Sequence, residues 1–193
     1  MPMARDAAET RRRILASALT AFAEDGFAGA RVAAIADAAS SNQRMIYAYF
    51  DSKEGLFEAV ANDVIERMHA EVPFTPEDLP AYALALFDYA MSHPEVVRFQ
   101  ARRTLEGQPA TARELELYAE KLEAVAAAQA AGALRGDDEP VALMVRTLGA
   151  VSSWVQAPAG LRPSLTGIDL RERIREDVTA IVEPAVRVRG AVD

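Results

Sequence analysis

Six side chains between residues 42 and 53 have the chemistry that contact with DNA requires. They are Asn42, Gln43, Arg44, Tyr47, Tyr49 and Lys53. Arginine pairs with guanine in the major groove, and asparagine or glutamine pairs with adenine, so the first three could read base edges. The tyrosine hydroxyls and the lysine ammonium could contact the flanking phosphates. A protein that only carries a ligand has no reason to expose these residue types together.

The first element that would position these side chains is a helix over residues 7–25. Its apolar stripe consists of Ile14, Ala18, Leu19 and Phe22. Asp6 and Glu9 have the spacing of a capping box at its start, and Gly26 is placed to end it. Phe27 follows, where a hydrophobic residue commonly packs back on the last turn.

Two short helices are predicted next, over residues 31–38 and 42–50, with only three residues between them. These are the proportions of a helix-turn-helix, whose second helix lies in the major groove. Ile46 and Phe50, four residues apart, would form the inward face of that second helix. They would pack on the apolar residues of the neighbouring helices, namely Ile14, Phe22, Val32 and Ile35.

Residues 10–57 closely resemble the DNA-binding domain of the tetracycline-repressor-like (TetR) family of transcription regulators, over about a quarter of the chain. The resemblance is carried by Ile14, Ala18, Phe22, Gly26-Phe27, Ile35-Ala36, Ala38-Ala39, Ile46-Tyr47, Tyr49-Phe50, Lys53 and Leu56. It implies contacts to the DNA backbone from Arg31, Tyr47, Tyr49 and Lys53. It implies contacts to bases from Gln43 and Arg44.

Four residues of this segment depart from the family's usual pattern. Ser40 and Ser41 stand where the family usually has a glycine and a valine-like residue in the turn, which leaves the backbone angles at Ser40 open. Met45 replaces a common threonine, so a hydroxyl contact to phosphate would be lost. Arg44 replaces a small residue and adds a long arm that can reach a base or a phosphate.

The rest of the chain is also predicted to be helical. Helices are expected over residues 53–71, 79–92, 94–106, 111–131, 141–156 and 168–187, with capping residues at Asp51 and Thr75. We therefore predict an all-α fold of about nine helices. The expected organisation is a helix-turn-helix domain over residues 1–55 and a helical ligand-binding and dimerisation domain over residues 56–193.

Composition and charge bound the function further. The net charge is −8, but residues 1–55 hold seven basic and seven acidic residues, so the excess of acid lies entirely downstream. A basic face can therefore still form on the first segment. The absence of cysteine excludes disulfides and thiolate metal sites. No secretory signal or membrane-spanning segment is visible in the sequence, and a cytoplasmic protein is expected.

Several residue patterns have the spacing or charge of a functional motif but are more simply explained as structure. Glu66 and His69 have the spacing of half a carboxylate-bridged metal site, but the other half is missing from the sequence, so a structural role is favoured. The segment Arg11–Arg13 has the charge to contact phosphate, but a solvated helix face is favoured. A second solvated face was expected of Glu114, Glu116, Glu120, Lys121 and Glu123. No catalytic arrangement, metal site or cofactor motif is identified, so an enzyme is not expected.

The aromatic residues and methionines of the second part are expected to form mostly core. Five of them were selected as candidates for the lining of an apolar ligand pocket: Phe87, Met91, Phe99, Tyr118 and Trp154.

The favoured interpretation is a homodimeric, sequence-specific DNA-binding regulator, a repressor released by a small apolar or amphipathic ligand. The helices over residues 141–156 and 168–187 would form the dimer interface, because their apolar surface is hard to bury otherwise. Two-fold symmetry then requires a pseudo-palindromic operator in double-stranded DNA. The helix from residue 53 to residue 71 joins both parts and would act as the lever. The alternative is a helical ligand carrier or protein-partner dimer that does not act through DNA.

Overall fold

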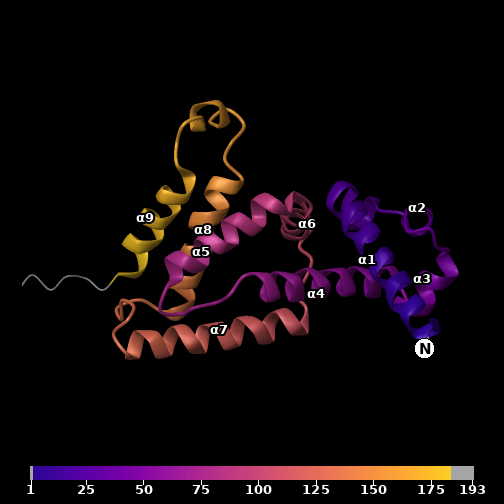
Figure 1. Ribbon diagram of the computed structural model, residues 1–193, viewed down its shortest axis with the longest axis horizontal. Coiled ribbons are helices and arrows are strands. Elements are labelled where there is room, and N and C mark those ends of the chain that lie inside the picture. The colour runs from indigo at the N-terminus through magenta and orange to yellow at the C-terminus, as the bar shows by residue number, and fades with distance from the viewer. Residues whose placement is uncertain (1, 184–193) are drawn as a thin grey trace, which may run out of the picture. The chain divides into compact units, whose positions relative to one another are not determined.

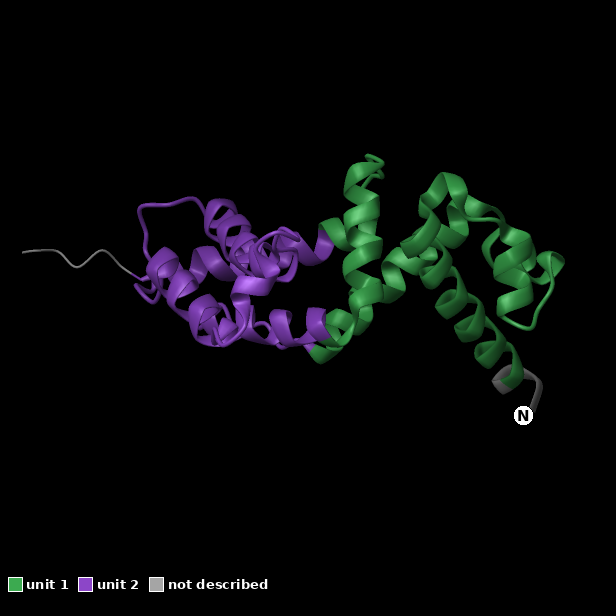
Figure 2. Ribbon diagram, turned by 90° about the horizontal axis from the view of Figure 1, so that it is seen from above, with its two compact units in different colours: residues 1–71, 92–115 green, residues 72–91, 116–193 purple. Residues whose placement is uncertain are grey.

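The computed structural model describes the backbone of residues 2–183 and the side chains of residues 6–183. These residues form nine α-helices and one short 3-10 helix, without a strand among them (Figure 1). The predicted all-helical fold is confirmed. Two compact units are present: unit 1 comprises Met1–Glu71 and Ser92–Leu115, and unit 2 comprises Val72–Met91 and Glu116–Asp193 (Figure 2).

Helix α1 (Pro2–Gly29) starts earlier than the sequence predicted. Asp6 and Glu9 therefore lie inside the helix, and the capping box expected there is wrong. The predicted break at Gly26 is present, with φ 72 and ψ 178 at this residue. A side chain at Gly26 would be strained by this φ, and its Cβ would overlap the carboxylate of Glu106. Phe27 packs back on the helix as expected, with its ring centre 6.3 Å from that of Phe22.

The helix-turn-helix consists of α2 (Val32–Ala38) and α3 (Gln43–Phe50). Ser40 in the turn adopts a positive φ of 49, the conformation that glycine favours. The Ser40 amide donates to the carbonyl of Asp37 at 3.1 Å, and the Ser41 amide donates to that of Ala36 at 2.9 Å. The turn therefore keeps its tight backbone path although it lacks the family's usual glycine.

Helix α4 (Lys53–Glu71) follows, and its cap differs from the prediction by one residue. The Ser52 hydroxyl accepts the Gly55 amide at 2.9 Å and is the cap, whereas Asp51 has a φ of 60 and only precedes it. The same correction applies to α5 (Leu79–Ser92). There Asp78, not Thr75, accepts the Ala81 amide, at 3.0 Å.

Helix α6 (Pro94–Leu105) completes unit 1 and is tied to the end of α1. The Arg102 guanidinium donates to the carbonyl of Glu24 at 2.9 Å, and the Phe27 amide donates to the Glu106 carboxylate at 2.8 Å. The ring of Phe99, fully buried, lies 5.3 Å from that of Phe57 on α4. Unit 1 thus fixes α1, α4 and α6 against one another.

Unit 2 is built from α5, most of α7 (Ala112–Ala130), α8 (Pro140–Val155) and α9 (Leu170–Val182). A 3-10 helix, Arg162–Leu165, interrupts the loop predicted between α8 and α9. The apolar residues Ile174, Val178 and Val182 are buried and form the inner face of α9. Residues 184–187, the end of the predicted last helix, lie outside the described residues.

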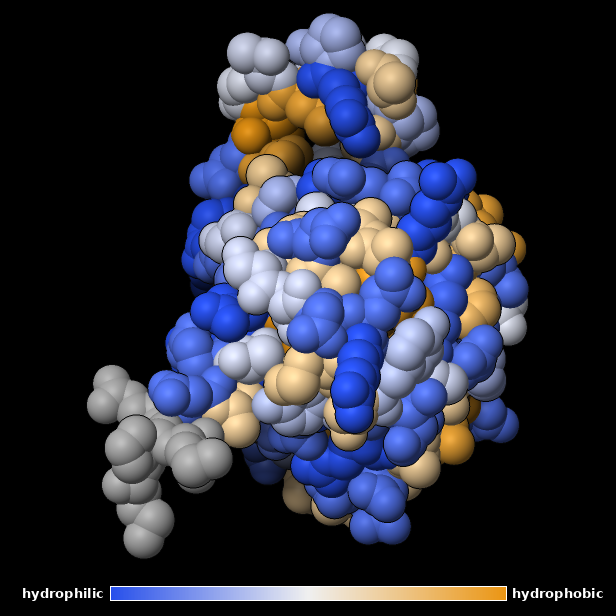
Figure 3. All heavy atoms as spheres, turned by 90° about the vertical axis from the view of Figure 1, so that its right-hand side faces the viewer, coloured by the Kyte–Doolittle hydropathy of each residue, from blue (hydrophilic) through white to orange (hydrophobic). Residues whose placement is uncertain are grey.

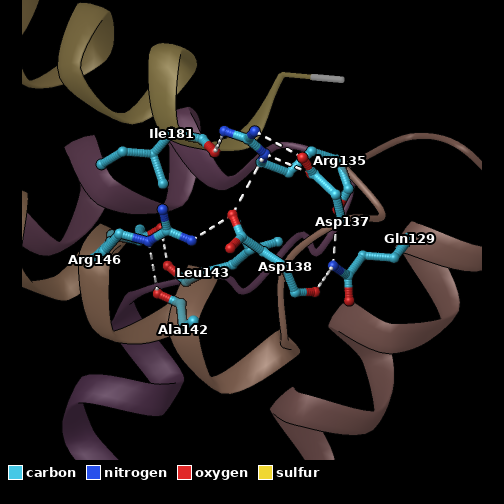
Figure 4. A network of polar contacts seen from close by, with 9 residues as sticks. Gln129, Arg135, Asp137, Asp138, Ala142, Leu143, Arg146 and Ile181 are labelled. Atoms are coloured by element: carbon cyan, nitrogen blue, oxygen red, sulfur yellow. Dashed lines mark hydrogen bonds and ion pairs between the residues drawn. The ribbon is translucent and has the colours of Figure 1, made fainter. Parts of the chain in front are cut away.

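A polar network ties the connection between α7 and α8 to α9 (Figure 4). Arg135 pairs with Asp137 at 2.8 Å, and its amide donates to the carbonyl of Val182 at 2.9 Å. Asp138 pairs with Arg146 on α8. The Gln129 amide group donates to the carbonyls of Arg135 and Asp138 at 2.7 Å each. These contacts hold a charged, glycine-containing connection in one conformation.

Among the described residues, no helix combines the length and apolar character that crossing a bilayer requires.

Candidate nucleic-acid interface

Helix α3 presents an apolar inner face and a polar outer face. Ile46 is fully buried and Phe50 is 5% exposed, which confirms that these two residues point inward. Gln43 and Arg44 are exposed at the start of the helix, and Tyr47 is 44% exposed one turn later. Within the described residues, the side chains of Gln43 and Arg44 make no hydrogen bond or ion pair. Their donors and acceptors are therefore open to a partner from outside the chain.

The surface around α2 and α3 suits a hydrated partner. Figure 3 shows the side of the molecule on which these two helices lie, and most of that surface is hydrophilic, with only scattered apolar residues. Arg31 is exposed and occupies the position just before α2. The outer surface of α3 is not entirely polar. Met45, which is 37% exposed, lies on it near Tyr47.

Asn42 has a structural role that the sequence analysis did not assign. Its Oδ1 accepts the amide of Met45 at 2.9 Å, which makes it the N-cap of α3. The cap occupies the acceptor that a bidentate pair with adenine would need. Only the Nδ2 group of this side chain is left to donate to a phosphate or a base.

Tyr49 and Lys53 lie at the edge of the helix-turn-helix and also contact the protein. The Tyr49 hydroxyl donates to the carbonyl of Ala7 at 3.4 Å, and this side chain is half-buried. The Lys53 ammonium lies 4.9 Å from the ring centre of Phe27 and 3.5 Å from the carbonyl of Ala28. Both polar ends are therefore held near the ends of α1 rather than free in solvent.

The arginines of α1 differ from one another in their surroundings. Arg12 pairs with Glu9, and Arg13 donates to the Thr10 hydroxyl at 3.4 Å. The Arg11 guanidinium lies 5.4 Å from the ring centre of Phe50, the inward residue at the end of α3. Arg11 is thus placed beside α3, whereas Arg12 is engaged within its own helix.

Four phenylalanines of unit 1 form one cluster beneath the helix-turn-helix. The ring centres of Phe22 and Phe27 lie 4.9 and 5.2 Å from that of Phe57, both at steep angles, and Phe99 joins at 5.3 Å. Such edge-on pairs are favoured by the ring quadrupoles. This phenylalanine cluster connects α1, α4 and α6. It therefore holds in place the helices that support α3.

The five residues selected for a ligand pocket do not share one environment. Phe99 belongs to the phenylalanine cluster of unit 1, whereas the other four lie in unit 2. Phe87 is 6% exposed and Met91 is 59% exposed. The Trp154 indole donates to the Asp177 carboxylate on α9 at 3.0 Å, and Tyr118 lies beside Lys121. The structure thus does not bring the five together in one unit.

Lys121 in unit 2 is a buried charged residue, although the sequence predicted a solvated position for it. It is 8% exposed, so its assignment to a solvated face is wrong. Its ammonium donates to the Tyr82 hydroxyl at 2.8 Å and lies between 4.9 and 5.9 Å from the ring centres of Phe74, Tyr82 and Tyr118. The signal was present, because Leu117, Lys121 and Val125 are four residues apart on one helical stripe.

Burial determines the protonation of this lysine cluster, defined as Lys121, Phe74, Tyr82 and Tyr118. Burial lowers the pKa of the Lys121 ammonium below its ordinary value, because a charge is costly in an apolar surrounding. Burial, followed by the neighbouring Tyr118, raises the pKa of the Tyr82 hydroxyl far above its ordinary value. Lys121 forms no ion pair with any residue that the structure describes, and its ammonium is surrounded by the three aromatic rings and the Tyr82 hydroxyl.

Glu114 also departs from the expected solvated face. Its carboxylate binds the Arg103 guanidinium at 2.9 Å, with the side chains 17% and 7% exposed. Glu66, weighed for a metal site, pairs instead with Arg113 at 2.6 Å. The described residues contain no group of three or more histidine, aspartate or glutamate side chains arranged to hold a metal ion.

Comparison with known proteins identifies both parts of the chain. The sequence model of bacterial regulatory proteins of the tetR family matches residues 14–60. The model of the tetracyclin repressor-like C-terminal domain matches residues 78–187, more than half of the chain. The first match contains α2 and α3, and the second covers the helices that follow α4.

Individual relatives agree with these matches. The chain is 33% identical to the HTH-type transcriptional repressor SCO4008 of Streptomyces coelicolor over 190 residues, covering 93% of this chain and 98% of that protein. It is 35% identical over 109 residues to the HTH-type transcriptional repressor NicS of Pseudomonas putida, covering 53% and 51% of the two chains. The crystal structure of SCO4942 from Streptomyces coelicolor, assigned as a transcriptional regulator, matches with a TM-score of 0.79 and 31% identity, covering 90% and 98%.

These matches account for the outward polar face of α3 and for the helical unit that follows it. A helix whose inner face is locked into a phenylalanine-supported core, and whose outer face offers unpaired polar groups, is what reading a DNA groove requires. The resemblance of residues 10–57 to one family therefore extends along almost the whole chain. This chain belongs to the TetR family of DNA-binding transcription regulators.

Proposed function

We propose that this chain is a homodimeric repressor that binds a pseudo-palindromic operator and is released by a small apolar or amphipathic ligand. The observation that carries the proposal is the outer face of α3, where Gln43 and Arg44 are exposed without partners among the described residues. The names of the relatives SCO4008 and NicS, both transcriptional repressors, support repression rather than activation.

The proposed DNA contacts divide by chemistry. Gln43 and Arg44 would read base edges, because their side chains are long, polar and unpaired. The remaining candidates would contact the sugar-phosphate backbone: Arg31, Asn42, Tyr47, Tyr49 and Lys53. For Asn42 we propose a donor contact from Nδ2 only, since its Oδ1 caps α3. For Tyr49 and Lys53, contacts to the protein hold the polar ends in place before DNA arrives, which reduces the entropy lost on binding.

The dimer is proposed to form through residues 141–156 and 168–187. Helices α8 and α9 pack on each other in unit 2, and α8 still leaves Val141 and Val145 47% and 62% exposed. Exposed apolar side chains one turn apart on a helix favour burial against a partner. A second copy would cover them and would place two α3 helices on one two-fold axis.

The ligand-binding and dimerisation domain is proposed to span residues 56–193, after a DNA-binding domain of residues 1–55. Four of the candidate pocket residues lie in unit 2 and stay part of this proposal: Phe87, Met91, Tyr118 and Trp154. Phe99 lies in unit 1 and would line a pocket only there. The lysine cluster is the polar point in unit 2, since a buried ammonium with one hydroxyl partner can still donate to a ligand. Helix α4 is the proposed lever between ligand and DNA.

The first experiment is a selection of random oligonucleotides with the purified chain at about 150 mM salt, where non-specific binding is weak. Enrichment of a two-fold symmetric site is expected. No enrichment with a confirmed dimer would contradict the proposal and favour a ligand carrier or protein-partner dimer.

The selected site then tests the role of Arg44. Arg44→Ala should weaken binding to that site by about 1–3 kcal/mol while binding to unrelated DNA changes less. Arg98→Ala is the matched control, because Arg98 is an equally charged, exposed arginine on α6. Equal losses on all sequences would show that Arg44 contacts phosphate and reads no base.

A further inference from the structure

A cavity of about 340 Å³ opens within unit 1, close to the helix-turn-helix. Residues of α4, Arg103 of α6 and the connection from residue 108 to residue 112 line it. Its volume falls in the range of small-molecule sites. It lies outside the lysine cluster and outside the residues proposed for the effector pocket of unit 2.

The walls of this cavity are apolar and pre-formed. Phe27 and Phe57 supply aromatic surface, and Ala61, Pro109 and Ala110 supply aliphatic surface. The connection is fixed from both ends, because the Thr111 hydroxyl donates to Asn62 at 2.6 Å, and Arg103 donates to the Pro109 carbonyl at 3.0 Å. A ligand would therefore find walls that need little ordering on binding, which favours affinity.

The charges at the cavity select for a cation. Glu54 and Glu58 line it, both are exposed, and neither forms an ion pair with any described residue. The positive charge of Arg103 is already matched by Glu114 at 2.9 Å. The lining therefore carries an excess of carboxylate beside two aromatic rings, and both features attract an organic ammonium group.

One polar group in the lining calls for a hydrogen-bond acceptor. Arg103 is 6% exposed, and its Nε has no hydrogen-bond partner in the described part of the chain. Its other nitrogens bind Gln100, Pro109 and Glu114. A buried donor without a partner is costly, so a ligand oxygen that reaches it would remove that cost.

We propose that this cavity is a second small-molecule site, for a compact cationic amphiphile that has an aromatic or alicyclic body, one acceptor oxygen and an amine. The body would pack on Phe27 and Phe57, the amine would lie by Glu54 and Glu58, and the oxygen would face Arg103. Because Phe27 also contacts the Lys53 ammonium at 4.9 Å, occupancy changes the affinity for DNA. This regulatory consequence rests on the proposed function, whereas the binding site does not.

The test uses three benzoyl compounds that differ in charge, titrated into the full chain by calorimetry. Procainamide has the ring, the carbonyl and a protonated tertiary amine, 4-aminobenzamide lacks that tertiary amine and is neutral, and 4-aminobenzoate is an anion. Procainamide should bind with a Kd on the order of 0.1–1 mM, the affinity usual for its size. The other two should bind about tenfold more weakly or not at all. Failure of procainamide to bind by about 10 mM overturns the site.

Variants locate the binding. Glu58→Gln should weaken procainamide about 3- to 5-fold, as the loss of an exposed charge pair does, and Glu71→Gln is the control on the same helix. Ala110→Trp should abolish binding, because residue 110 is exposed and a large ring there fills the cavity mouth without disturbing the core. Unchanged binding in Ala110→Trp overturns the cavity, and unchanged binding in Glu58→Gln overturns the preference for a cation.

Regulation is measured separately, with the DNA site obtained by selection. Saturating procainamide should change the Kd of wild-type protein for that site at least about threefold and leave the Ala110→Trp variant unaffected. If procainamide binds but the DNA affinity is constant, the regulatory consequence is overturned and the binding site stands. If no DNA site is selected at all, the proposed function fails while calorimetry still decides the cavity.

Discussion

The two units each contain an aromatic cluster, and the clusters differ in how they treat charge. In unit 1 four phenylalanines pack together, with Phe22 and Phe27 edge-on to Phe57 and Phe99 tilted against it, and the cations Lys53 and Arg103 lie against the outside of the cluster. In unit 2 the rings of Phe74, Tyr82 and Tyr118 surround a buried ammonium, that of Lys121. One cluster excludes charge and the other encloses it.

This difference agrees with the roles proposed for the two units, which are support of the DNA-reading helix in unit 1 and ligand binding in unit 2. A purely apolar cluster gains stability by burial and has a single packed arrangement, which suits a base for the DNA-reading helix. An enclosed ammonium with a lowered pKa has a stability that depends on pH and on whatever can accept its hydrogen bonds. Unit 2 therefore has a group whose energy a ligand could change, which agrees with the effector-binding role proposed for it.

The largest expected effect comes from removing a ring of the apolar cluster. Phe99→Ala should lower the free energy of unfolding by about 3–5 kcal/mol, because a fully buried ring leaves a cavity. Urea denaturation measures this change. Met91→Ala is the contrast, since Met91 is 59% exposed, and it should stay within about 0.5 kcal/mol of wild type. A small loss in Phe99→Ala would mean that this ring lines an open pocket.

The second prediction concerns the enclosed charge. Because burial lowers the pKa of Lys121, the unfolded chain binds its proton more strongly than the folded chain does, so stability rises with pH toward the ordinary value of 10.5. Lys121→Met removes that rise. Relative to wild type, the variant should therefore be more stable at neutral pH than it is at about pH 9.5.

The measurement for Lys121 is urea denaturation of both proteins between about pH 7 and pH 9.5, below the ordinary pKa of tyrosine. Below that pKa Tyr82 is mostly protonated in both the folded and the unfolded chain, so it adds little slope in this range, and its raised pKa affects stability only at higher pH. The difference in unfolding free energy between wild type and Lys121→Met also includes the loss of the hydrogen bond to the Tyr82 hydroxyl. That loss is the same at both pH values, so it cancels when the differences at the two pH values are compared. Parallel pH profiles would show that Lys121 is solvated in the folded chain.

A smaller effect is expected at the cap of α3, above the apolar cluster. Asn42→Ala should cost about 1 kcal/mol of stability, because the Met45 amide loses its acceptor. Asn42→Asp keeps an acceptor and should retain the stability, although its charge should weaken DNA binding. Thermal unfolding and DNA titration separate the two effects. Equal stability of Asn42→Ala and wild type would exclude a contribution from the cap.

The smallest predicted effect lies in the turn before α3. Ser40→Gly should stabilise the chain by about 0.5–1 kcal/mol, because its φ of 49 costs a serine more than a glycine. Ala38→Gly, two residues earlier in α2, should instead destabilise by a similar amount, since glycine is a poor helix residue. Thermal unfolding of both variants tests the contrast. A destabilised Ser40→Gly would mean that the serine side chain supports the turn.

Local signals were enough for most of the fold. Apolar spacing, capping residues and breaks placed the nine described α-helices to within about five residues, because these effects act over one or two turns, whereas the 3-10 helix Arg162–Leu165 was not predicted. The cap positions were less certain. Asp51 and Thr75 were expected as caps, but Ser52 and Asp78 have that role, since several adjacent side chains could have accepted the same amide.

The candidate site was predictable in part for the same reason. The inward direction of Ile46 and Phe50 follows from helical periodicity, and so does the outward direction of Gln43 and Arg44. The capping role of Asn42 depends on which rotamer the folded turn selects, and the sequence indicated only a base reader at this position.

The sequence by itself determined the helices, the turn at residues 39–41 and the residue types on the outer face of α3, because these depend on neighbours within a few positions. Only the tertiary structure decided that Phe99 belongs with the phenylalanines of α1 and α4, that Lys121 is enclosed by aromatic rings, and that Arg103 lines a cavity beside Glu54 and Glu58. Each of these depends on residues more than 30 positions apart in the chain. Such residues meet only when whole helices pack, and no periodicity within one helix reports which partners they meet.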